Sequence, residues 1–245
     1  MKFTVRMANM NIGIESVYEH LQEYCKDYCI PECNPDISIK VEKKDIEVER
    51  NNEDGLTFSE EYLETIALLR KIAEVFPMYN RVLCHGAALT YADEGAFLFT
   101  APSGTGKTTH IRMWRRHLGE AVRIVNGDKP FLEIREDTVQ VYGTPWAGKE
   151  RWQKNRDAEL KGICHIKRGE KCSIRRLEPL ECLDWIMNQV YVPQKGGMVE
   201  KTLEQIEKIL ERVPVYELTC DISEDAVRCC FEAMTGLKYE DHVNK

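Results

Sequence analysis

The segment that most constrains this chain is residues 101–109, which read APSGTGKTT and follow an apolar run at residues 96–100. The segment matches the pattern G-x-x-x-x-G-K-[ST] at every fixed position except the first, where Ala101 replaces glycine. That replacement costs little if the φ angle of Ala101 is negative. Apolar residues then recur at helical spacing up to Leu118. A strand, a glycine-rich turn and a helix in this order predict a loop whose backbone N–H groups surround phosphates.

The residue types in this loop each suit a phosphate ligand. Gly104 and Gly106 allow the backbone to turn its N–H groups inward. Lys107 is expected to neutralise the β and γ oxygens, and the Thr108 hydroxyl is expected to hold Mg²⁺. The predicted nucleotide-binding residues are Ser103, Gly104, Thr105, Gly106, Lys107, Thr108 and Thr109. The alternative is a chance glycine-rich turn before a helix, which the strand on one side and the helix on the other disfavour.

A second apolar run, residues 123–125, leads to Asp128, about twenty residues beyond the loop, a separation that one helix and a short return explain. Asp128 is therefore the candidate carboxylate for a metal ion or for base catalysis. The alternative is an ordinary turn residue, because Asn126, Gly127 and Asp128 are all common in turns. The two interpretations are compatible, since functional residues often lie on loops at strand ends.

The order of these features resembles a known group of proteins. His85-Gly86, the apolar residues 97–99, the phosphate loop and Asp128 resemble the nucleotide-binding core of HPr kinase/phosphorylase and of ATP-dependent phosphoenolpyruvate carboxykinase. Residues 126–130 and 142–149 more closely resemble the HPr-kinase-like proteins of bacteria, some of which accompany peptide-modification clusters. The resemblance covers roughly residues 80–220. It implies an α/β fold, a P-loop core of the HPr kinase type with a mixed sheet, in which Thr108 and Asp128 hold Mg²⁺ and Lys107 contacts ATP.

The chain also departs from these families. Where their pattern has two adjacent aspartates, this chain has Gly127 followed by Asp128, so one carboxylate is missing. The Glu-x-Arg-Gly signature of HPr kinase is absent as well, and phosphorylation of HPr itself is therefore not expected. A complete phosphoenolpyruvate carboxykinase is excluded, because 245 residues leave no room for its substrate lobe.

Three further residues are candidates for the reacting end of the site. The resemblance places His85 near the transferred phosphoryl group, where an imidazole can orient a nucleophile or stabilise charge, and a purely structural histidine is the alternative. Residues 143–149 read as a loop in which Trp146 and Lys149 are expected to contact the substrate, with packing as the alternative role of Trp146. Nearby cations suit an anionic ligand, although solvated surface charge is the default interpretation: Arg151, Lys154 and Arg156.

The chain is predicted to contain two parts, a strand-and-helix layer at residues 1–80 packed on a P-loop kinase-like core at residues 81–245. Within the first part the expected elements are a strand-like segment at 2–14, a pair of strands at 37–48, a turn at 51–55, and a helix that Ser59 caps and Pro77 ends. Within the core the expected strands are 81–89, 96–100, 162–166, 172–177 and 215–218, and the expected helices follow residue 107 and occupy 179–192, 202–213 and 223–236.

Composition excludes several classes of protein. The net charge is −7, hydrophobic residues make up 43% and charged residues 31%, and there is no apolar run of the roughly 18 residues that a spanning helix needs. The first residues contain no continuous signal-peptide core, so we expect a cytoplasmic protein with no membrane and no nucleic acid as partner. Ten cysteines are expected to be free thiols, and the spacing of Cys25, Cys29 and Cys33 lacks the second pair of a zinc site.

The leading hypothesis is an ATP-binding, Mg²⁺-dependent kinase that transfers the γ-phosphoryl group to a hydroxyl of a protein, peptide or small molecule. Asp128, Lys107 and His85 are its expected catalytic residues. One alternative is a nucleotide-binding sensor or regulatory module with little turnover, motivated by the missing aspartate, and another is a hydrolase or phosphorylase that reverses the kinase step. No guanine-reading Asn-Lys-x-Asp element is present, which favours adenine. Homo-oligomerisation stays open.

Overall fold

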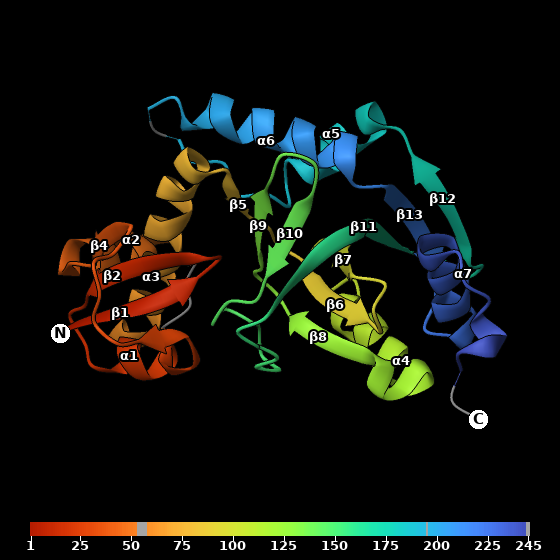
Figure 1. Ribbon diagram of the computed structural model, residues 1–245, viewed down its shortest axis with the longest axis horizontal. Coiled ribbons are helices and arrows are strands. Elements are labelled where there is room, and N and C mark those ends of the chain that lie inside the picture. The colour runs from red at the N-terminus through yellow and green to blue at the C-terminus, as the bar shows by residue number, and fades with distance from the viewer. Residues whose placement is uncertain (53–57, 195, 244–245) are drawn as a thin grey trace.

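The computed structural model describes residues 1–52, 58–194 and 196–243 and contains two sheets with helices packed around them (Figure 1). One sheet has four strands, and the other has nine and mixes parallel with antiparallel pairs. The α/β class expected from the sequence is confirmed in this form, a mixed α/β fold with a mixed sheet. Among the described residues there is no helix with the length and apolar character that crossing a membrane requires.

The four-stranded sheet is built from the N-terminal residues, in the order β3-β1-β2-β4. Its centre is a hairpin in which Ala8 and Asn9 both have positive φ angles (47° and 58°), the geometry of a tight two-residue turn. The single strand-like segment expected at residues 2–14 is therefore two strands. The elements of this region are β1 (Lys2–Met7), β2 (Met10–Glu15), α1 (His20–Tyr24), β3 (Cys29–Ile30) and β4 (Ile37–Lys40).

The pair of strands expected at residues 37–48 is wrong in its second half. Residues Ile37 to Lys40 form β4, but Lys43–Asn52 forms the helix α2. Asp45 accepts a hydrogen bond from the Glu42 N–H (2.8 Å), which satisfies one backbone donor at the start of the helix. Ile46 is buried while Val48 is exposed, as helical rather than alternating geometry requires. The turn expected at 51–55 overlaps the end of α2, and its residues 53–55 lie outside the described part of the chain.

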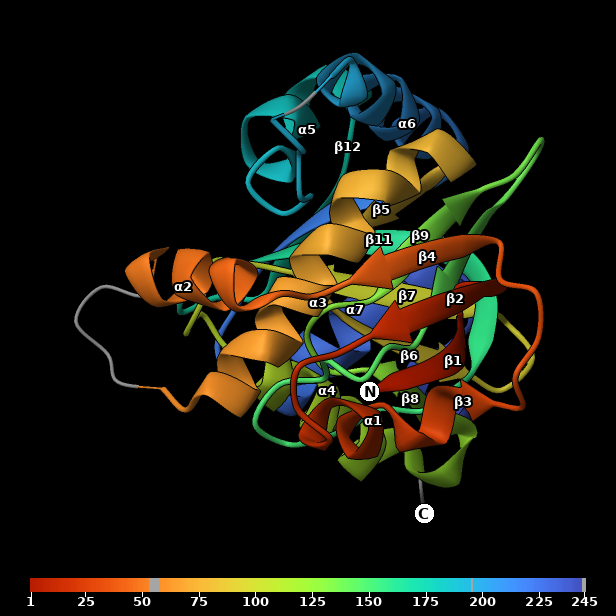
Figure 2. The same ribbon diagram turned by 90° about the vertical axis from the view of Figure 1, so that its left-hand side faces the viewer.

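The helix α3 (Glu60–Val75) packs its apolar side on the four-stranded sheet, and Figure 2 shows it lying between that sheet and the rest of the molecule. The Ser59 hydroxyl accepts a hydrogen bond from the Tyr62 N–H (3.2 Å), so the predicted N-cap is confirmed. Pro77 lies in a short 3₁₀ turn directly after the helix.

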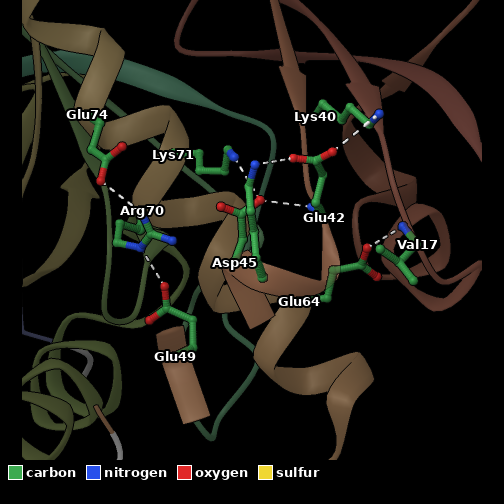
Figure 3. A network of polar contacts seen from close by, with 10 residues as sticks. Val17, Lys40, Glu42, Asp45, Glu49, Glu64, Arg70, Lys71 and Glu74 are labelled. Carbon is green, nitrogen blue, oxygen red and sulfur yellow. Dashed lines mark hydrogen bonds and ion pairs between the residues drawn. The ribbon is translucent and has the colours of Figure 1, made fainter. Parts of the chain in front are cut away.

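Charged side chains fasten α3 to its neighbours (Figure 3). Arg70 donates to Glu49 of α2 (2.5 Å) and to Glu74 (2.8 Å), and Lys71 donates to Asp45 (2.8 Å). Glu64, which is 0% exposed, accepts the Val17 N–H (2.6 Å) from the segment before α1. Because buried carboxylates are costly without partners, these bonds fix α3 to both α2 and the start of α1.

The nine-stranded sheet has the order β5-β9-β10-β11-β7-β6-β8, with β13 also pairing β11 and β12 pairing β13. Its strands are β5 (Arg81–Leu83), β6 (Ala87–Tyr91), β7 (Ala96–Thr100), β8 (Val122–Asn126), β9 (Phe131–Ile134), β10 (Val139–Tyr142), β11 (Asp157–Arg168), β12 (Ser173–Leu177) and β13 (Val215–Cys220). The strands β7, β11 and β13 are mutually parallel, so their carboxyl ends meet at one edge.

Two differences from the expected strands matter for the site. The strand expected at 81–89 is interrupted after Leu83, because β5 pairs with β9 whereas β6 pairs with β7 and β8. His85 and Gly86 lie in this interruption, and a Cβ atom on Gly86 would be only 2.9 Å from Leu98. The strands β9 and β10 had no counterpart among the expected elements.

Helices cover both faces of the nine-stranded sheet. Leu98 of β7 belongs to the core with α5 (Pro179–Ile186) and α6 (Met198–Arg212), whereas Phe97 and Phe99 belong to the core with α4 (Lys107–Leu118) and α7 (Glu224–Thr235). Alternate residues of the strand thus face opposite helical layers, as a strand buried on both sides requires. α5 ends earlier than expected, and α6 begins earlier.

The last helix has the expected ends but not the expected cap. Gly236 has a φ of 73° and terminates α7. Ser223 occupies the N-cap position, but its hydroxyl donates to Asp221 (2.5 Å) instead of accepting a helix N–H.

The division at residue 80 stays a prediction. A continuous apolar core joins α3 to Phe131 and Tyr142 of the large sheet.

Candidate functional site

The phosphate loop connects β7 to α4 in the geometry that the sequence predicts. Gly104 and Gly106 have φ angles of 76° and 125°, which residues with side chains rarely adopt. No atom lies within 4 Å of a Cβ built at either position, so glycine is needed here for its backbone conformation rather than for space. Ala101 is fully buried in the core and does not have a positive φ, so its methyl group replaces the glycine of the pattern without strain.

Lys107 is folded back onto the loop at the start of α4. Its Nζ atom donates to the Ala101 carbonyl oxygen (2.8 Å), and the residue is 8% exposed. Burial lowers the pKa of Lys107, and the negative charge of Asp128 partly offsets that effect. An ammonium group held close to the loop and shielded from water attracts phosphate oxygens strongly.

Arg168, at the end of β11, fastens the loop from the outside. Its Nε atom donates to the Thr105 carbonyl oxygen (3.0 Å), and its Nη2 atom donates to the Gly104 carbonyl oxygen. These bonds tie the loop carbonyls to the end of β11, while the Thr105 N–H donates to the Pro102 carbonyl oxygen (3.2 Å). Sequence reasoning missed Arg168 because only the parallel pairing of β11 with β7 brings the two segments together.

Asp128 is positioned by a buried asparagine at the end of β8. The Oδ1 atom of Asn126 accepts the N–H groups of Asp128 and Lys129, both at 2.8 Å. Its Nδ2 atom donates to the carbonyl oxygen (3.0 Å) and the hydroxyl (3.1 Å) of Thr144. Asn126 is 0% exposed, so these bonds form away from solvent and determine the turn that presents Asp128.

His85 meets Asp128 from the interruption between β5 and β6. Its Nε2 atom lies 3.4 Å from the Asp128 Oδ1 atom, and the Gly86 N–H donates to the Asp128 carbonyl oxygen (2.9 Å). Burial tends to raise the pKa of Asp128, but the hydrogen bond from His85 and the charges of Lys129 and Lys107 together hold it below its usual range. The carboxyl group is therefore ionised at neutral pH.

The structure brings together the three residues expected to be catalytic, Lys107, Asp128 and His85. Thr108 and Thr109 follow Lys107 in the first turn of α4 and are half-buried, while Ser103 is exposed on the loop. The described residues contain no cluster of three or more histidine, cysteine or acidic side chains suited to a metal ion. Mg²⁺ does not need such a cluster, because it is usually held by one or two carboxylates together with phosphate oxygens and water. The ionised Asp128 and the Thr108 hydroxyl fit that pattern.

Packing explains the absence of a second aspartate. A Cβ atom on Gly127 would lie 2.5 Å from the carbonyl oxygen of Ala147, a distance that no real side chain tolerates. The same segment supplies the Trp146 carbonyl, which accepts the Lys129 N–H (3.1 Å). The site is thus built around a single carboxylate.

The loop at residues 143–149 has an inner and an outer part. Trp146 is 4% exposed, and its Nε1 atom donates to the Thr65 carbonyl oxygen of α3 (2.9 Å). Its ring also packs near Tyr24, with 6.0 Å between centroids. Trp146 thus has the packing role, and its contact with a substrate stays a prediction. Lys149 is exposed beyond Gly148, whose α-carbon adjoins Asp128, and its contact with a substrate stays a prediction.

Another histidine lies close to Lys107 and was not singled out by its sequence context. The ring of His165, on β11, stacks on Trp185 with 4.4 Å between centroids. Its Nδ1 atom is 3.4 Å from the hydroxyl of Thr100, the residue before the phosphate loop. Burial, with a contribution from Lys167, lowers its pKa, which keeps the ring neutral beneath the loop.

A cavity of about 550 Å³ opens beside the phosphate loop, and we call it the loop cavity. Its lining comes from the loop, from α4, and from the residues that follow β11 and β13: Thr105, Gly106, Thr109, His110, Met113, Ile166, Arg168, Gly169, Glu170, Cys220, Asp221 and Ile222. A slightly larger cavity of about 620 Å³ is lined by residues of the N-terminal sheet and lies away from the phosphate loop. Of these two cavities, the loop cavity is the one next to the phosphate loop.

Comparison with known proteins does not establish a family. No protein-family model matches this sequence, and no curated protein matches it either. Among solved structures, the HPr(Ser) kinase/phosphatase from Coxiella burnetii matches 62% of this chain and 92% of its own, with 11% sequence identity and a TM-score of 0.34. A similarity this low supports no argument about activity.

Proposed function

We propose that this chain binds ATP with Mg²⁺ and transfers the γ-phosphoryl group to a hydroxyl of a protein, peptide or small-molecule acceptor. The observation that carries the proposal is the meeting of Lys107, Asp128 and His85 beside a loop with two glycines of positive φ. Phosphoryl transfer depends mainly on positioning and charge neutralisation. A cation and an ionised carboxylate next to a phosphate-binding loop offer both.

The contacts of the loop explain how it would receive phosphates. Lys107 satisfies its Nζ atom with the Ala101 carbonyl, so phosphate oxygens compete with one neutral acceptor and not with another charge. The first N–H groups of α4, a helix of 12 residues, add the positive end of its dipole. Together they favour an anion at the mouth of the loop.

The carboxylate has two roles open to it. Thr108 and Asp128 would hold Mg²⁺, which when bound neutralises charge on the phosphate oxygens. Alternatively, Asp128 accepts the proton of the attacking hydroxyl as a general base. In either role the hydrogen bond from His85 fixes the orientation of the carboxylate.

The loop cavity suits the base of the nucleotide. Met113, Ile166 and Ile222 give it an apolar lining next to the phosphate loop, and Ile222 is 77% exposed at its rim. Large exposed apolar side chains beside a cavity favour contact with a flat aromatic ligand.

The packing at Gly127 favours a second candidate, a nucleotide-binding module with little turnover. Because Ala147 leaves no room for another carboxylate, one side chain would have to serve both metal and base. A site of this kind can retain affinity for the nucleotide through Lys107 and the loop N–H groups while lacking a competent base.

Binding and transfer experiments test both candidates. Calorimetry with Mg·ATP is expected to detect binding by the unaltered chain, and Lys107→Ala is expected to weaken it roughly ten- to hundred-fold, the value of one charge-assisted hydrogen bond. Lys208→Ala, which removes an exposed lysine of α6, serves as the matched control and is expected to bind normally. Equal affinity of Lys107→Ala and the unaltered chain would refute nucleotide binding at this loop.

Label transfer from ATP to components of a cell extract then separates the two functions. Transfer by the unaltered chain and by Lys208→Ala, but not by Lys107→Ala, supports the kinase. Tight binding without transfer to any acceptor supports the sensor.

A further inference from the structure

Two of the ten cysteines face each other at the surface next to the loop cavity. Cys172 precedes β12, and its Sγ atom lies 3.5 Å from the carbonyl oxygen of Asp225 on α7. Cys229 follows Asp225 by one helical turn and therefore shares its face of the helix. Cys172 and Cys229 line the same surface cavity, and Cys229 affects the environment of the Cys172 thiol. The turn before β12 and the helix α7 thus meet through two sulfur atoms.

Small oxidants can reach this pair. Both residues are half-buried, and both line a surface cavity of about 590 Å³ together with Lys171 and Arg228. A second pair in the same protein gives an internal comparison. The Sγ atoms of Cys164 and Cys230 lie 3.9 Å apart, but both residues are 0% exposed in the core. The two pairs therefore differ in their access to small oxidants.

The exposed pair lies directly behind the wall of the loop cavity. Glu170 and Asp221 line both the loop cavity and the surface cavity that contains the two thiols. The Gly169 N–H donates to the Cys220 carbonyl oxygen (2.9 Å), and Arg168 binds the phosphate loop. The turn at residues 169–172 therefore connects the thiols to the phosphate loop within a few residues.

We propose that Cys172 and Cys229 form a reversible disulfide that fixes this turn to α7 and tightens nucleotide binding in the loop cavity. The effect on binding rests on the proposed function, whereas disulfide formation does not. Because Cys172 contacts the Asp225 carbonyl one helical turn before Cys229, a small movement of the turn toward α7 brings the two Sγ atoms to the S–S bond length of about 2.05 Å. The bond immobilises the cavity wall before the nucleotide arrives, which lowers the ordering cost of binding.

The chemistry balances with a peroxide as the oxidant. We assign the first attack to Cys229, because burial raises the pKa of Cys172 and so disfavours the Cys172 thiolate. Its thiolate takes an oxygen from H₂O₂, breaking the O–O bond and giving a sulfenic acid and, with a proton, one water. The sulfur of Cys172 then displaces the sulfenic oxygen, which leaves as a second water with the thiol proton. Two thiols are oxidised and one peroxide is reduced to two waters. A dithiol reductant reverses the bond by exchange.

Peptide mapping of the full chain tests the disulfide without any nucleotide. After treatment with H₂O₂, mass spectrometry under non-reducing conditions is expected to find a Cys172–Cys229 cross-link that dithiothreitol removes. The cross-link is expected in the control variant Cys33→Ser, which lacks a different exposed thiol, and not in Cys172→Ser or Cys229→Ser. Absence of the cross-link, or oxidation of Cys164–Cys230 to the same extent, overturns the proposal.

Nucleotide affinity tests the second part of the proposal, that the disulfide tightens binding in the loop cavity. The oxidised chain is expected to bind Mg·ATP roughly three-fold or more tightly than the reduced chain, the gain from ordering one or two side chains in advance. Cys229→Ser should show no such difference after the same treatment. A cross-link with unchanged or weaker affinity overturns the effect on the cavity. Reduced protein that binds no Mg·ATP refutes the proposed function and leaves the cross-link to be judged from the peptide map.

Discussion

Replacing Asn126 by alanine tests whether a buried hydrogen-bonding turn positions Asp128. The side chain of Asn126 makes four hydrogen bonds at a position that is 0% exposed. Alanine removes all four and leaves the backbone of β8 able to keep its pairing. The change therefore isolates the support of Asp128 from Asp128 itself.

The size of the effect follows from which groups lose their partners. The Lys129 N–H keeps the Trp146 carbonyl (3.1 Å), and the Thr144 hydroxyl keeps the Lys129 carbonyl (2.7 Å). The Asp128 N–H and the Thr144 carbonyl oxygen are left without one, since the described residues offer neither a second partner. At about 1–3 kcal/mol for each of these two groups, Asn126→Ala is expected to lower the free energy of unfolding by about 2–6 kcal/mol.

Urea denaturation followed by circular dichroism measures this free energy, and calorimetry with Mg·ATP measures the accompanying loss of affinity. The matched control is Asn188→Ala, which removes one hydrogen bond from an exposed asparagine to the Asp184 carbonyl (2.9 Å) and is expected to cost less than about 0.5 kcal/mol. If Asn126→Ala is no more destabilising than Asn188→Ala, the hydrogen bonds of Asn126 do not hold the turn that presents Asp128.

Two further predictions concern stability. Burial lowers the pKa of His110 to about 4, while its Nε2 atom accepts the Trp114 Nε1–H (3.0 Å), so the native state disfavours the protonated ring. Its contribution is complete above the unfolded pKa of about 6.5 and is lost as pH falls toward 4, by up to about 3 kcal/mol. Urea titrations at several pH values should show this loss, and a His110→Gln variant with an equally steep pH dependence would contradict it. Gly127→Ala is expected to destabilise the fold by about 1–3 kcal/mol, because its Cβ atom meets the Ala147 carbonyl oxygen. A thermal unfolding midpoint unchanged by Gly127→Ala would contradict this prediction, because it would mean that residues 143–148 move aside at no cost in stability.

The phosphate loop could be predicted from the sequence because its requirements are local. Positive φ angles at Gly104 and Gly106 and a lysine at the start of the next helix are properties of nine consecutive residues. Ser59 as a helix cap and Gly236 as a helix terminus were predictable for the same reason. Each of these signals is decided by backbone conformation within a few residues.

The supports of the site could not be predicted, because they depend on contacts between distant segments. Arg168 reaches Thr105 through the pairing of β11 with β7, and Trp146 reaches Thr65 across 81 positions of sequence. Nothing in the residues around Arg168 distinguishes it from other arginines at strand ends. The strand predicted in place of α2 was wrong for a different reason. A short run with Ile46 and Val48 fits the alternation of a strand as well as the spacing of a helix until burial is known.

The helix α3 gives the molecule a common support for two regions, the segment leading to α1 and the segment that abuts Gly127. Glu64 accepts the Val17 N–H from the segment leading to α1, and the carbonyl oxygen of the adjacent Thr65 accepts the Trp146 Nε1–H from the segment that abuts Gly127. These two attachment points are neighbours on one rigid helix. A displacement of the N-terminal sheet that carried α3 with it would therefore be transmitted to the residues flanking Asp128 without passing through the large sheet. The helix α3 thus couples the position of the N-terminal sheet to the position of Asp128.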